Sequence, residues 1–184
     1  MKITSGRFKY RNIEVPQGIR PTTEKVREAI FSVISAWIPD AEVLDLFAGS
    51  GAMGLEALSR GAARCTFVES DRRNQKMIAA NIGNCGAGEI SRIVGRDYAA
   101  ALAELANGSK DRRFDVVIID PPYEKTGYYD TALRLLQEYE LIDDASIVVC
   151  EHLYNNKLSD TYSNLQKIKE KKYGTIGVDT FTIL

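Results

Sequence analysis

Short apolar runs alternate with amphipathic stretches along most of the chain beyond residue 42. Continuous apolar runs indicate buried strands, and apolar residues that recur at three- and four-residue spacing indicate helices. Gly61, Gly83 and Gly108 stand just past the expected ends of three helices, where glycine is common. This alternation predicts an α/β fold with a doubly wound, mainly parallel sheet. The expected strands cover residues 43–47, 65–68, 90–94, 114–119 and 146–150, and the expected helices cover residues 52–59, 73–82, 98–106 and 129–139.

The N-terminal end of the chain has a different pattern. Thr22 or Thr23 can cap a helix that Pro39 ends. Two short β-like stretches precede this helix, near residues 2–4 and 9–15, with Gly and Pro residues between and after them. They predict a small N-terminal β-hairpin that is followed by the helix.

The C-terminal end also departs from the alternation of strands and helices. Residues 165–173 and 178–184 flank a turn that holds two glycines, which predicts a closing antiparallel hairpin at one edge of the sheet. With no repeat or linker in view, we expect one domain over residues 1–184. It divides into an N-terminal extension over residues 1–40 and a core over residues 41–184.

The composition is typical of one compact soluble domain, with 184 residues, 45% hydrophobic and 27% charged. The apolar run around residues 116–119 is far shorter than the roughly 20 residues of a membrane helix, and the sequence after Met1 has no signal-peptide pattern. We therefore expect a cytoplasmic protein without membrane contact. Cys65, Cys85 and Cys150 are odd in number and widely spaced, which indicates buried reduced thiols and no zinc site.

The net charge of −1 hides an uneven distribution. Residues 1–27 hold seven Lys or Arg against two Glu, a local charge of +5, so that the rest of the chain carries −6. A basic extension on a mildly acidic body is a candidate surface for phosphate groups, although a solvated charged face would have the same composition.

A glycine-rich loop follows the first core strand. Gly49, Gly51 and Gly54 fit the pattern GxGxxG between a strand and a helix. Glycine lets the backbone turn tightly and lets a ligand approach it, and the helix that follows presents free N–H groups. Glu69 ends the next strand, 20 residues after Gly49, where a carboxylate can accept hydrogen bonds from both ribose hydroxyls. The loop therefore predicts a cofactor that contains a nucleoside.

Two other carboxylates bear on which cofactor this is. Asp45 precedes the loop, where it would suit the ammonium group of a methionine moiety and would repel a pyrophosphate. This favours S-adenosylmethionine over a dinucleotide. Asp97 follows the third core strand, where it can accept a hydrogen bond from an adenine amino group or cap the helix that starts at Tyr98.

The tetrapeptide Asp120-Pro121-Pro122-Tyr123 follows the most apolar strand. In open α/β folds, ligands bind at the carboxyl ends of the strands. Proline donates no backbone hydrogen bond, so this segment presents carbonyl groups, a carboxylate and a phenol ring. Such a set can accept both hydrogens of an exocyclic amine, stack on its planar ring and orient its lone pair toward a methyl donor.

Longer segments that include these motifs resemble a known family. They are Asp45–Ala62, Phe67–Glu69, Asp120–Tyr123 and the early segments Gly18–Thr23 and Val26–Glu28. Together they resemble the RsmD family, a bacterial family that methylates a guanine N2 in small-subunit (16S) ribosomal RNA. The resemblance spans most of the chain. It departs from the family in the final hairpin, where Tyr173-Gly174-Thr175 lacks an acidic residue after the glycine.

The resemblance implies a Rossmann-like class I methyltransferase with a seven-stranded sheet, S-adenosylmethionine as methyl donor and no metal. It implies that Asp45 and the loop backbone hold the methionine part, Glu69 the ribose and Asp97 the adenine. The full cofactor set that it implies is Asp45, Phe47, Ala48, Gly49, Ser50, Gly51, Glu69, Ser70, Asp97 and Tyr98. The catalytic set around the flipped guanine is Asp120, Pro121, Pro122 and Tyr123, and the RNA-binding set is Arg7, Lys9, Arg11, Arg20, Thr22 and Arg27.

Other functions stay open at this point. The substrate of such a methyltransferase can be ribosomal RNA, free or in an assembled or partly assembled small subunit, but also DNA adenine N6 or a protein amide. A nicotinamide oxidoreductase would use the same glycine loop and Glu69, yet His152, the one histidine, is more typical of a structural residue. A non-catalytic RNA-binding module would need only the basic extension. We expect a monomer.

Overall fold

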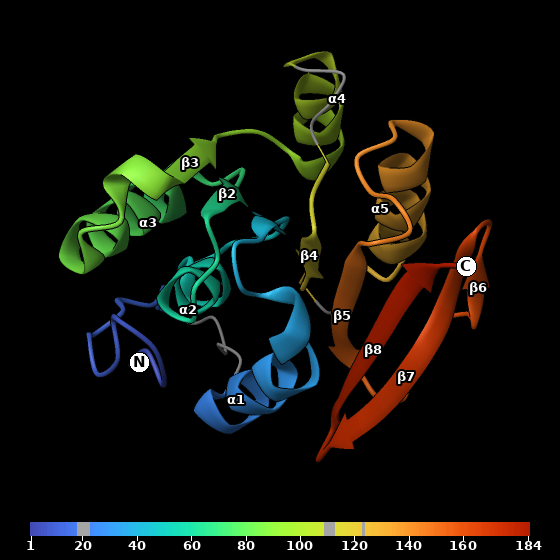
Figure 1. The fold of residues 1–184 in the computed structure, drawn as a ribbon, viewed down its shortest axis with the longest axis horizontal. Coiled ribbons are helices and arrows are strands. Elements are labelled where there is room, and N and C mark those ends of the chain that lie inside the picture. The colour runs from blue at the N-terminus through green and yellow to red at the C-terminus, as the bar shows by residue number, and fades with distance from the viewer. Residues whose placement is uncertain (18–22, 109–112, 123) are drawn as a thin grey trace.

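A twisted sheet runs through the whole protein (Figure 1). The computed structural model describes residues 1–17, 23–108, 113–122 and 124–184, and within them the sheet has eight strands in the order β3-β2-β1-β4-β5-β8-β7-β6. The first five strands pair in parallel, and β8, β7 and β6 add to β5 in antiparallel pairs. The strands are β1 Glu42–Asp45, β2 Arg64–Val68, β3 Ser91–Val94, β4 Val116–Ile119, β5 Ile147–Leu153, β6 Thr161–Tyr162, β7 Leu165–Tyr173 and β8 Ile176–Ile183.

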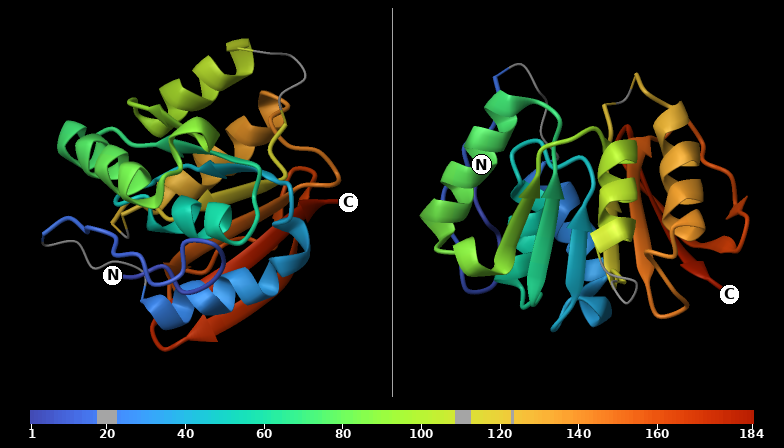
Figure 2. Two further views of the ribbon diagram at one scale, coloured as in Figure 1. Left: turned by 60° about the vertical axis from the view of Figure 1, so that its left-hand side comes forward. Right: turned by 90° about the horizontal axis from the view of Figure 1, so that it is seen from above.

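Helices cover both faces of this sheet (Figure 2). α1, α2 and α3 pack on one face, and α4 and α5 pack on the other. Short 3₁₀ turns follow α1 and α3. The helices are α1 Glu24–Val33, α2 Ala52–Ser59, α3 Arg72–Cys85, α4 Tyr98–Gly108 and α5 Gly127–Glu138, and the turns are η1 Ser35–Trp37 and η2 Gly88–Ile90.

Strand β4 shows why its sequence is apolar at every position. Val116 and Ile118 belong to the core on the side of α1, α2 and α3, whereas Val117 and Ile119 belong to the core on the side of α4 and α5. Each of the four side chains is at most 1% exposed. Successive strand residues point to opposite faces, so a strand covered by helices on both sides needs an unbroken apolar run.

The doubly wound, mainly parallel sheet with a closing hairpin is confirmed. Seven of the eight strands lie at the expected positions, and the expectation of seven missed the two-residue strand β6. The first helix ends at Val33 and not near Pro39, because the chain tightens into η1. α3 continues past Gly83 to Cys85, and Gly86 ends it in a left-handed conformation with φ of 66°.

The N-terminal arm, residues 1–17, is not the β-hairpin that the sequence predicts. An isolated antiparallel bridge joins Lys2 to Asn12, and neither side extends into a strand. Backbone bonds such as Ile13 N to Met1 O, at 2.7 Å, still hold the two sides together. Ile3, Phe8 and Ile13 turn inward and bury their side chains in the same core as α1 and α2. Because these three apolar side chains pack into the core, the arm lies along the core surface and does not project as a free hairpin.

The C-terminal hairpin encloses a buried charged group. His152 on β5 and Lys167 on β7 both contact the Asp179 carboxylate on β8, at 3.3 and 3.0 Å from Oδ2. These contacts keep the pKa of Asp179 below its ordinary value, although burial acts in the other direction. His152 is 1% exposed and so has the expected structural role. The three cysteines are buried and unpaired, as expected. Within the described part of the chain, we find no helix with the length and apolar character needed to span a bilayer.

Candidate active site

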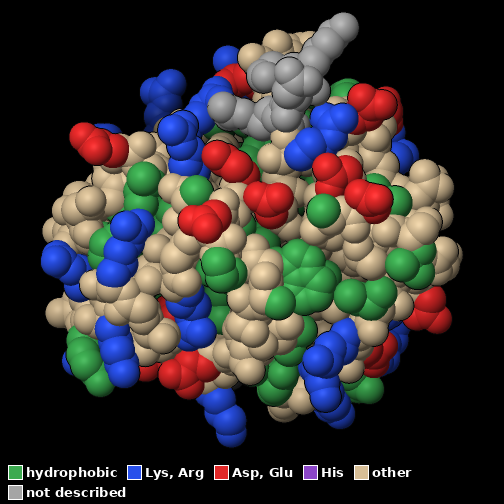
Figure 3. Space-filling model, in the orientation of Figure 1, with side chains coloured by type: hydrophobic (Ala, Val, Ile, Leu, Met, Phe, Trp, Pro, Cys, Tyr) green, Lys and Arg blue, Asp and Glu red, His purple; other side chains and the backbone are tan. Residues whose placement is uncertain are grey.

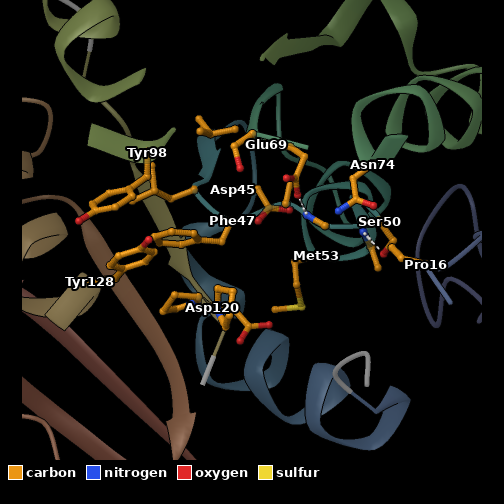
Figure 4. Close-up of a pocket in the computed structure, with 18 of the residues that line it drawn as sticks. Pro16, Asp45, Phe47, Ser50, Met53, Glu69, Asn74, Tyr98, Asp120 and Tyr128 are labelled. Carbon is orange, nitrogen blue, oxygen red and sulfur yellow. Dashed lines mark hydrogen bonds between the residues drawn. The ribbon is translucent and has the colours of Figure 1, made fainter. Parts of the chain in front are cut away.

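A cavity of about 660 Å³ opens at the carboxyl ends of the parallel strands (Figure 4). It lies where the strand order reverses between β1 and β4, which is the usual place for ligands in doubly wound folds. Of the fourteen residues expected to bind cofactor or substrate, twelve line it. They are Asp45, Phe47, Ala48, Gly49, Ser50, Glu69, Ser70, Asp97, Tyr98, Asp120, Pro121 and Pro122.

The glycine loop forms one wall of the cavity. Gly49 has φ of 56°, and a side chain there would meet no atom within 4 Å, so the backbone faces open space. Gly51 has φ of 79°, caps the N-terminus of α2, and packs against Ile78 and Phe67. It is a turn residue behind the cavity wall and does not line the cavity. The first N–H groups of α2 and its positive dipole end therefore lie beside the loop.

Asp45 is buried beneath this loop, with 2% of its surface exposed. Its Oδ2 accepts a hydrogen bond from Gly54 N at 2.9 Å, which ties the end of β1 to the first turn of α2. Burial raises the pKa of Asp45 to about 7, the hydrogen bond from Gly54 lowers it, and the charge of Glu69 adds to the rise. A cationic group in the cavity would favour the ionised form of this carboxyl.

Glu69 links the loop to the start of α3. Its Oε2 accepts from Gly49 N at 2.9 Å (Figure 4), and its Oε1 accepts from Asp71 N at 2.8 Å. Both oxygens are thus fixed by backbone N–H groups while the residue still lines the cavity. The carboxylate position expected for a ribose is present and rigid.

Asp97 caps helix α4. Its Oδ1 accepts from the N–H groups of Ala99 and Ala100, each at 3.1 Å, so the helix-cap alternative from the sequence is confirmed. The same residue lines the cavity, and the cap holds its carboxyl group at the rim. The cap and a contact with a bound base are therefore compatible.

Three aromatic rings, Phe47 from the loop after β1, Tyr98 from α4 and Tyr128 from α5, meet at one end of the cavity (Figure 4). Phe47 stacks on Tyr128 with centroids 5.8 Å apart and an angle of 15° between planes, and Tyr98 lies 5.1 Å from Phe47 and 4.7 Å from Tyr128. From the sequence, the aromatic residues at 128 and 129 either line the cleft or pack at the start of a helix, with packing the more common role, and the structure places Tyr128 in the cavity lining. Its neighbour Tyr129 points the other way, is buried, and donates its hydroxyl to Glu151 O at 2.6 Å. One helical turn therefore supplies one ring to the cavity and one to the core.

Asp120, Pro121 and Pro122 follow β4 and line the opposite side of the cavity. The Pro122 carbonyl accepts from Lys125 N at 2.9 Å, and this bond closes a turn between β4 and α5. Tyr123, expected beside them, lies outside the described residues. The carboxylate and the prolines thus meet the loop of β1 across one cavity, as the neighbouring positions of β1 and β4 require.

The expected RNA-binding residues fall into three groups. Arg7, Lys9 and Arg11 are exposed on the N-terminal arm. Arg20 and Thr22 lie outside the described residues. Arg27 is not on the surface, and its expected place among surface cations was wrong.

Arg27 is fully buried and paired with a buried carboxylate. Its Nε lies 3.1 Å from Glu56 Oε2, and both side chains are 0% exposed. Burial lowers the pKa of Arg27, and Glu56 partly restores it. Glu56 also accepts from Thr4 N at 3.0 Å and Ser5 N at 3.2 Å, and from Arg60 Nε at 2.8 Å. The pair therefore holds the N-terminal arm against α2.

The cavity also contains residues from the N-terminal arm, which sequence reasoning did not place there. Met1 and Pro16 line it together with Met53 and Asn74. Asn81 on α3 fixes this arrangement, because its side chain bonds both the N–H and the C=O of Glu14 and also the carbonyl of Ser50, each at 2.9 Å. Such contacts join segments more than 30 residues apart, and no local pattern in the sequence indicates them.

No group of three His, Cys, Asp or Glu side chains among the described residues has the arrangement of a metal site.

Comparison with known proteins gives consistent matches over most of the chain. The family described as "Conserved hypothetical protein 95" matches residues 1–182. Ribosomal RNA small subunit methyltransferase D of Escherichia coli (strain K12) is 34% identical over 178 residues, which cover 96% of this chain and 86% of that protein. The YlbH protein of Bacillus subtilis (strain 168) is 33% identical, with 97% and 96% covered. The solved structure of the yhhF protein from Escherichia coli is 33% identical and has a TM-score of 0.86. The match covers 100% of this chain and 97% of that one.

Proposed function

The chain belongs to the RsmD family and has the class I methyltransferase fold, and we propose that it transfers a methyl group from S-adenosylmethionine to the N2 amine of a guanine in small-subunit ribosomal RNA. The observation that carries this proposal is the cavity that joins the glycine loop and Glu69 to Asp120, Pro121 and Pro122. It holds acceptor groups for a nucleoside at one side and acceptor groups for an amine at the other. A methyltransferase of this kind needs both.

The residues present fit S-adenosylmethionine. The open backbone at Gly49, the fixed carboxylate of Glu69 and the ring cluster near Asp97 suit an aminoacyl chain, a ribose and a base in that order. The described lining has five Asp or Glu against three Lys or Arg, and two of these cations, Arg27 and Arg96, are paired with Glu56 and Glu104. This balance favours a cationic ligand over a pyrophosphate, which argues against a nicotinamide dinucleotide. When bound, the cofactor supplies a methyl group on a positively charged sulfur.

Asp120 and the prolines act on the amine. A guanine N2 is a weak nucleophile because its lone pair is delocalised into the ring. Asp120 and the Pro121 carbonyl accept its two hydrogens, which favours a pyramidal nitrogen with the lone pair directed away from them. The catalytic gain is then mainly orientation and proximity, and Asp120 takes up the proton that the amine loses after transfer.

The arm supplies the cations that an RNA backbone requires. Arg7, Lys9 and Arg11 are exposed within seventeen residues whose backbone is tied to α2 and α3. On the face in Figure 3, many Lys and Arg side chains lie at the left, over the arm, α2 and α3 of Figure 1, whereas Asp and Glu gather toward the upper centre. We assign phosphate contacts to these three cations.

The test is methyl transfer from radiolabelled S-adenosylmethionine to unmethylated 16S ribosomal RNA and to small subunits assembled from it. Label on a guanine N2 in either substrate is the expected result, and nuclease mapping identifies the base. Asp120→Asn should abolish transfer and leave S-adenosylhomocysteine affinity unchanged by calorimetry. Asp144→Asn, an exposed carboxylate in the loop before β5, is the matched control and should keep full activity. Label on DNA adenine or on a protein amide, and none on RNA, would overturn the proposal.

A further inference from the structure

Tyr10 exposes its ring at the tip of the N-terminal arm. It is 70% exposed, and among the large hydrophobic side chains of the described residues only Ile168 and Leu184 are similarly open to solvent. A single exposed apolar side chain needs no special explanation. Tyr10 has two further properties, its backbone conformation and its charged neighbours, that point to a ligand.

The backbone of Tyr10 is in the left-handed region, with φ of 71°. Glycine and asparagine adopt this conformation readily, but an aromatic residue does so only when its surroundings hold it there. Here, Tyr10 N donates to Ile3 O at 2.9 Å, and Arg11 N donates to Phe8 O at 3.0 Å. A tyrosine at this position therefore lowers the stability of the fold relative to glycine. With 70% of the residue exposed, burial of the ring offsets little of this loss.

The turn under Tyr10 is clamped to the C-terminal end of α2. Arg7 N donates to Ser59 O and Phe8 N donates to Ser59 Oγ, both at 2.9 Å. A side chain on Gly6 would lie 1.8 Å from Ser59 O, so the backbones are in direct contact. The backbone that carries the Tyr10 ring is therefore held in place by its contacts with α2.

Cations flank Tyr10 in the sequence, and one of them lies over its ring. Lys9 Nζ lies 4.9 Å from the Tyr10 ring centroid, and the Arg7 guanidinium lies 4.7 Å from the centroid of Phe8. Arg11 donates to the carbonyl of Asn84 at the end of α3. An aromatic ring with cations on either side in sequence is the combination that binds single-stranded nucleic acid, where the ring stacks on a base and the cations meet phosphates.

The arm connects this tip to the cavity. The tip lies at the C-terminal ends of α2 and α3, whereas Pro16 lies in the cavity wall near the start of those helices. Tyr10 N bonds Ile3 O at 2.9 Å, and Met1, two residues before Ile3 in the same arm, lines the cavity. An RNA that enters the cavity with one base can therefore reach the tip a few nucleotides away.

We propose that Tyr10 is a stacking platform for an unpaired RNA base outside the methylation cavity, with Arg7, Lys9 and Arg11 on the adjoining phosphates. This inference rests on the proposed function, because it names a second contact with the same RNA. It explains why a strained, exposed aromatic residue stands at the tip of a basic arm. Stacking tolerates any base, so the contact adds affinity and not sequence preference.

The experiment separates stability from RNA affinity at one position. Tyr10→Gly and Tyr10→Asn both remove the ring and both suit a positive φ, so the melting temperature should stay the same or rise. Affinity for a labelled single-stranded RNA of mixed sequence should fall about 5- to 100-fold, as expected for the loss of one stacked base. Tyr10→Phe keeps the ring and should bind within about twofold of the wild type.

Salt dependence distinguishes the ring from the cations. The Tyr10 variants should keep the wild-type slope of log affinity against log salt, since they remove no charge. Lys9→Gln should reduce that slope by about 0.7, the value for one phosphate contact on a single strand. S-adenosylhomocysteine affinity should be the same in all variants.

Three outcomes would overturn the inference. The first is wild-type RNA affinity in both Tyr10→Gly and Tyr10→Asn. The second is a Tyr10→Phe variant as weak as Tyr10→Asn, since the hydroxyl would then be the contact. The third is weaker binding to assembled small subunits alone, which would indicate a ribosomal protein as the partner. Wild-type protein that neither binds nor methylates RNA would instead contradict the proposed function.

Discussion

Gly54 gives a stringent test of how the cavity is supported, because α2 packs against β2 at this residue. A Cβ at Gly54 would lie 2.3 Å from Phe67 Cε1 and 2.6 Å from Cys65 Sγ. Both neighbours are fully buried, at 0% and 1% exposed, and ordinary carbon contacts begin near 3.5 Å. Gly54→Ala must therefore move α2 outward by about 1 Å, together with the Asp45 bond and the loop in front of it.

The expected cost follows from two opposing effects. Overpacking of this kind costs about 3 kcal/mol at the upper end of its range, since neither neighbour can yield. Alanine gains about 1 kcal/mol over glycine in a helix. The net loss of stability is about 2 kcal/mol, or a fall in melting temperature of about 4–8 °C for a chain of this size.

Gly83 offers a matched control within α3. It is exposed, and a Cβ there would meet no atom within 4 Å. Gly83→Ala should therefore stabilise the protein by about 1 kcal/mol from helix propensity alone. Urea and thermal unfolding of both variants give the two signs, and calorimetry with S-adenosylhomocysteine should show weaker binding only for Gly54→Ala. If Gly54→Ala is as stable as Gly83→Ala, the close contact between α2 and β2 does not limit the loop as argued.

Three other predictions concern buried or cavity carboxylates. The pKa of Asp45 is about 7 in the folded state and near 4 in the unfolded state. Between these pH values the folded state keeps a proton that the unfolded state releases. The free energy of unfolding should therefore fall as pH rises from about 4 to 7. Asp45→Asn should lack this fall in urea titrations at pH 4.5 and 7.5. Glu56→Gln leaves Arg27 buried without its counter-charge, so the free energy of unfolding measured in urea should fall by about 3–5 kcal/mol. Asp144→Asn, at an exposed carboxylate, should change the free energy of unfolding little. Glu69→Ala should weaken S-adenosylhomocysteine binding in calorimetry, and unchanged affinity would contradict its role at the ribose.

The core of the fold could be predicted because local patterns of apolar and polar residues indicate it. The unbroken apolar run of β4 requires helices on both faces of the sheet, and parallel strands with crossover helices follow from that. The parts that were mispredicted depend on contacts between distant residues. The arm was expected to pair with itself in strands, but Ile3, Phe8 and Ile13 lie in the core next to α1 and α2. The alternation of apolar and polar residues within the arm does not show that its apolar side chains pack beside α1 and α2.

The site shows the same division. The loop and the Asp120 segment could be placed together because each follows a strand, and carboxyl ends of parallel strands meet at one edge. Arg27 could not be assigned correctly, since its partner Glu56 is 29 residues away and only the fold shows that both are buried. Tyr128 needed the phase of α5 to be known, because its neighbour Tyr129 faces the core.

The last long strand of the sheet also bears on how the protein behaves at high concentration. β6 covers only two residues at the start of β7, so that in the described chain most of β7 has a neighbouring strand on one side only. An open edge of this length can recruit a second chain and start aggregation. Lys169, Lys171 and Lys172 are exposed along it, and a bulge between Lys167 and Lys169 breaks its regular spacing. Like charges and an irregular backbone oppose pairing with another copy, so the edge can stay open without recruiting a second chain.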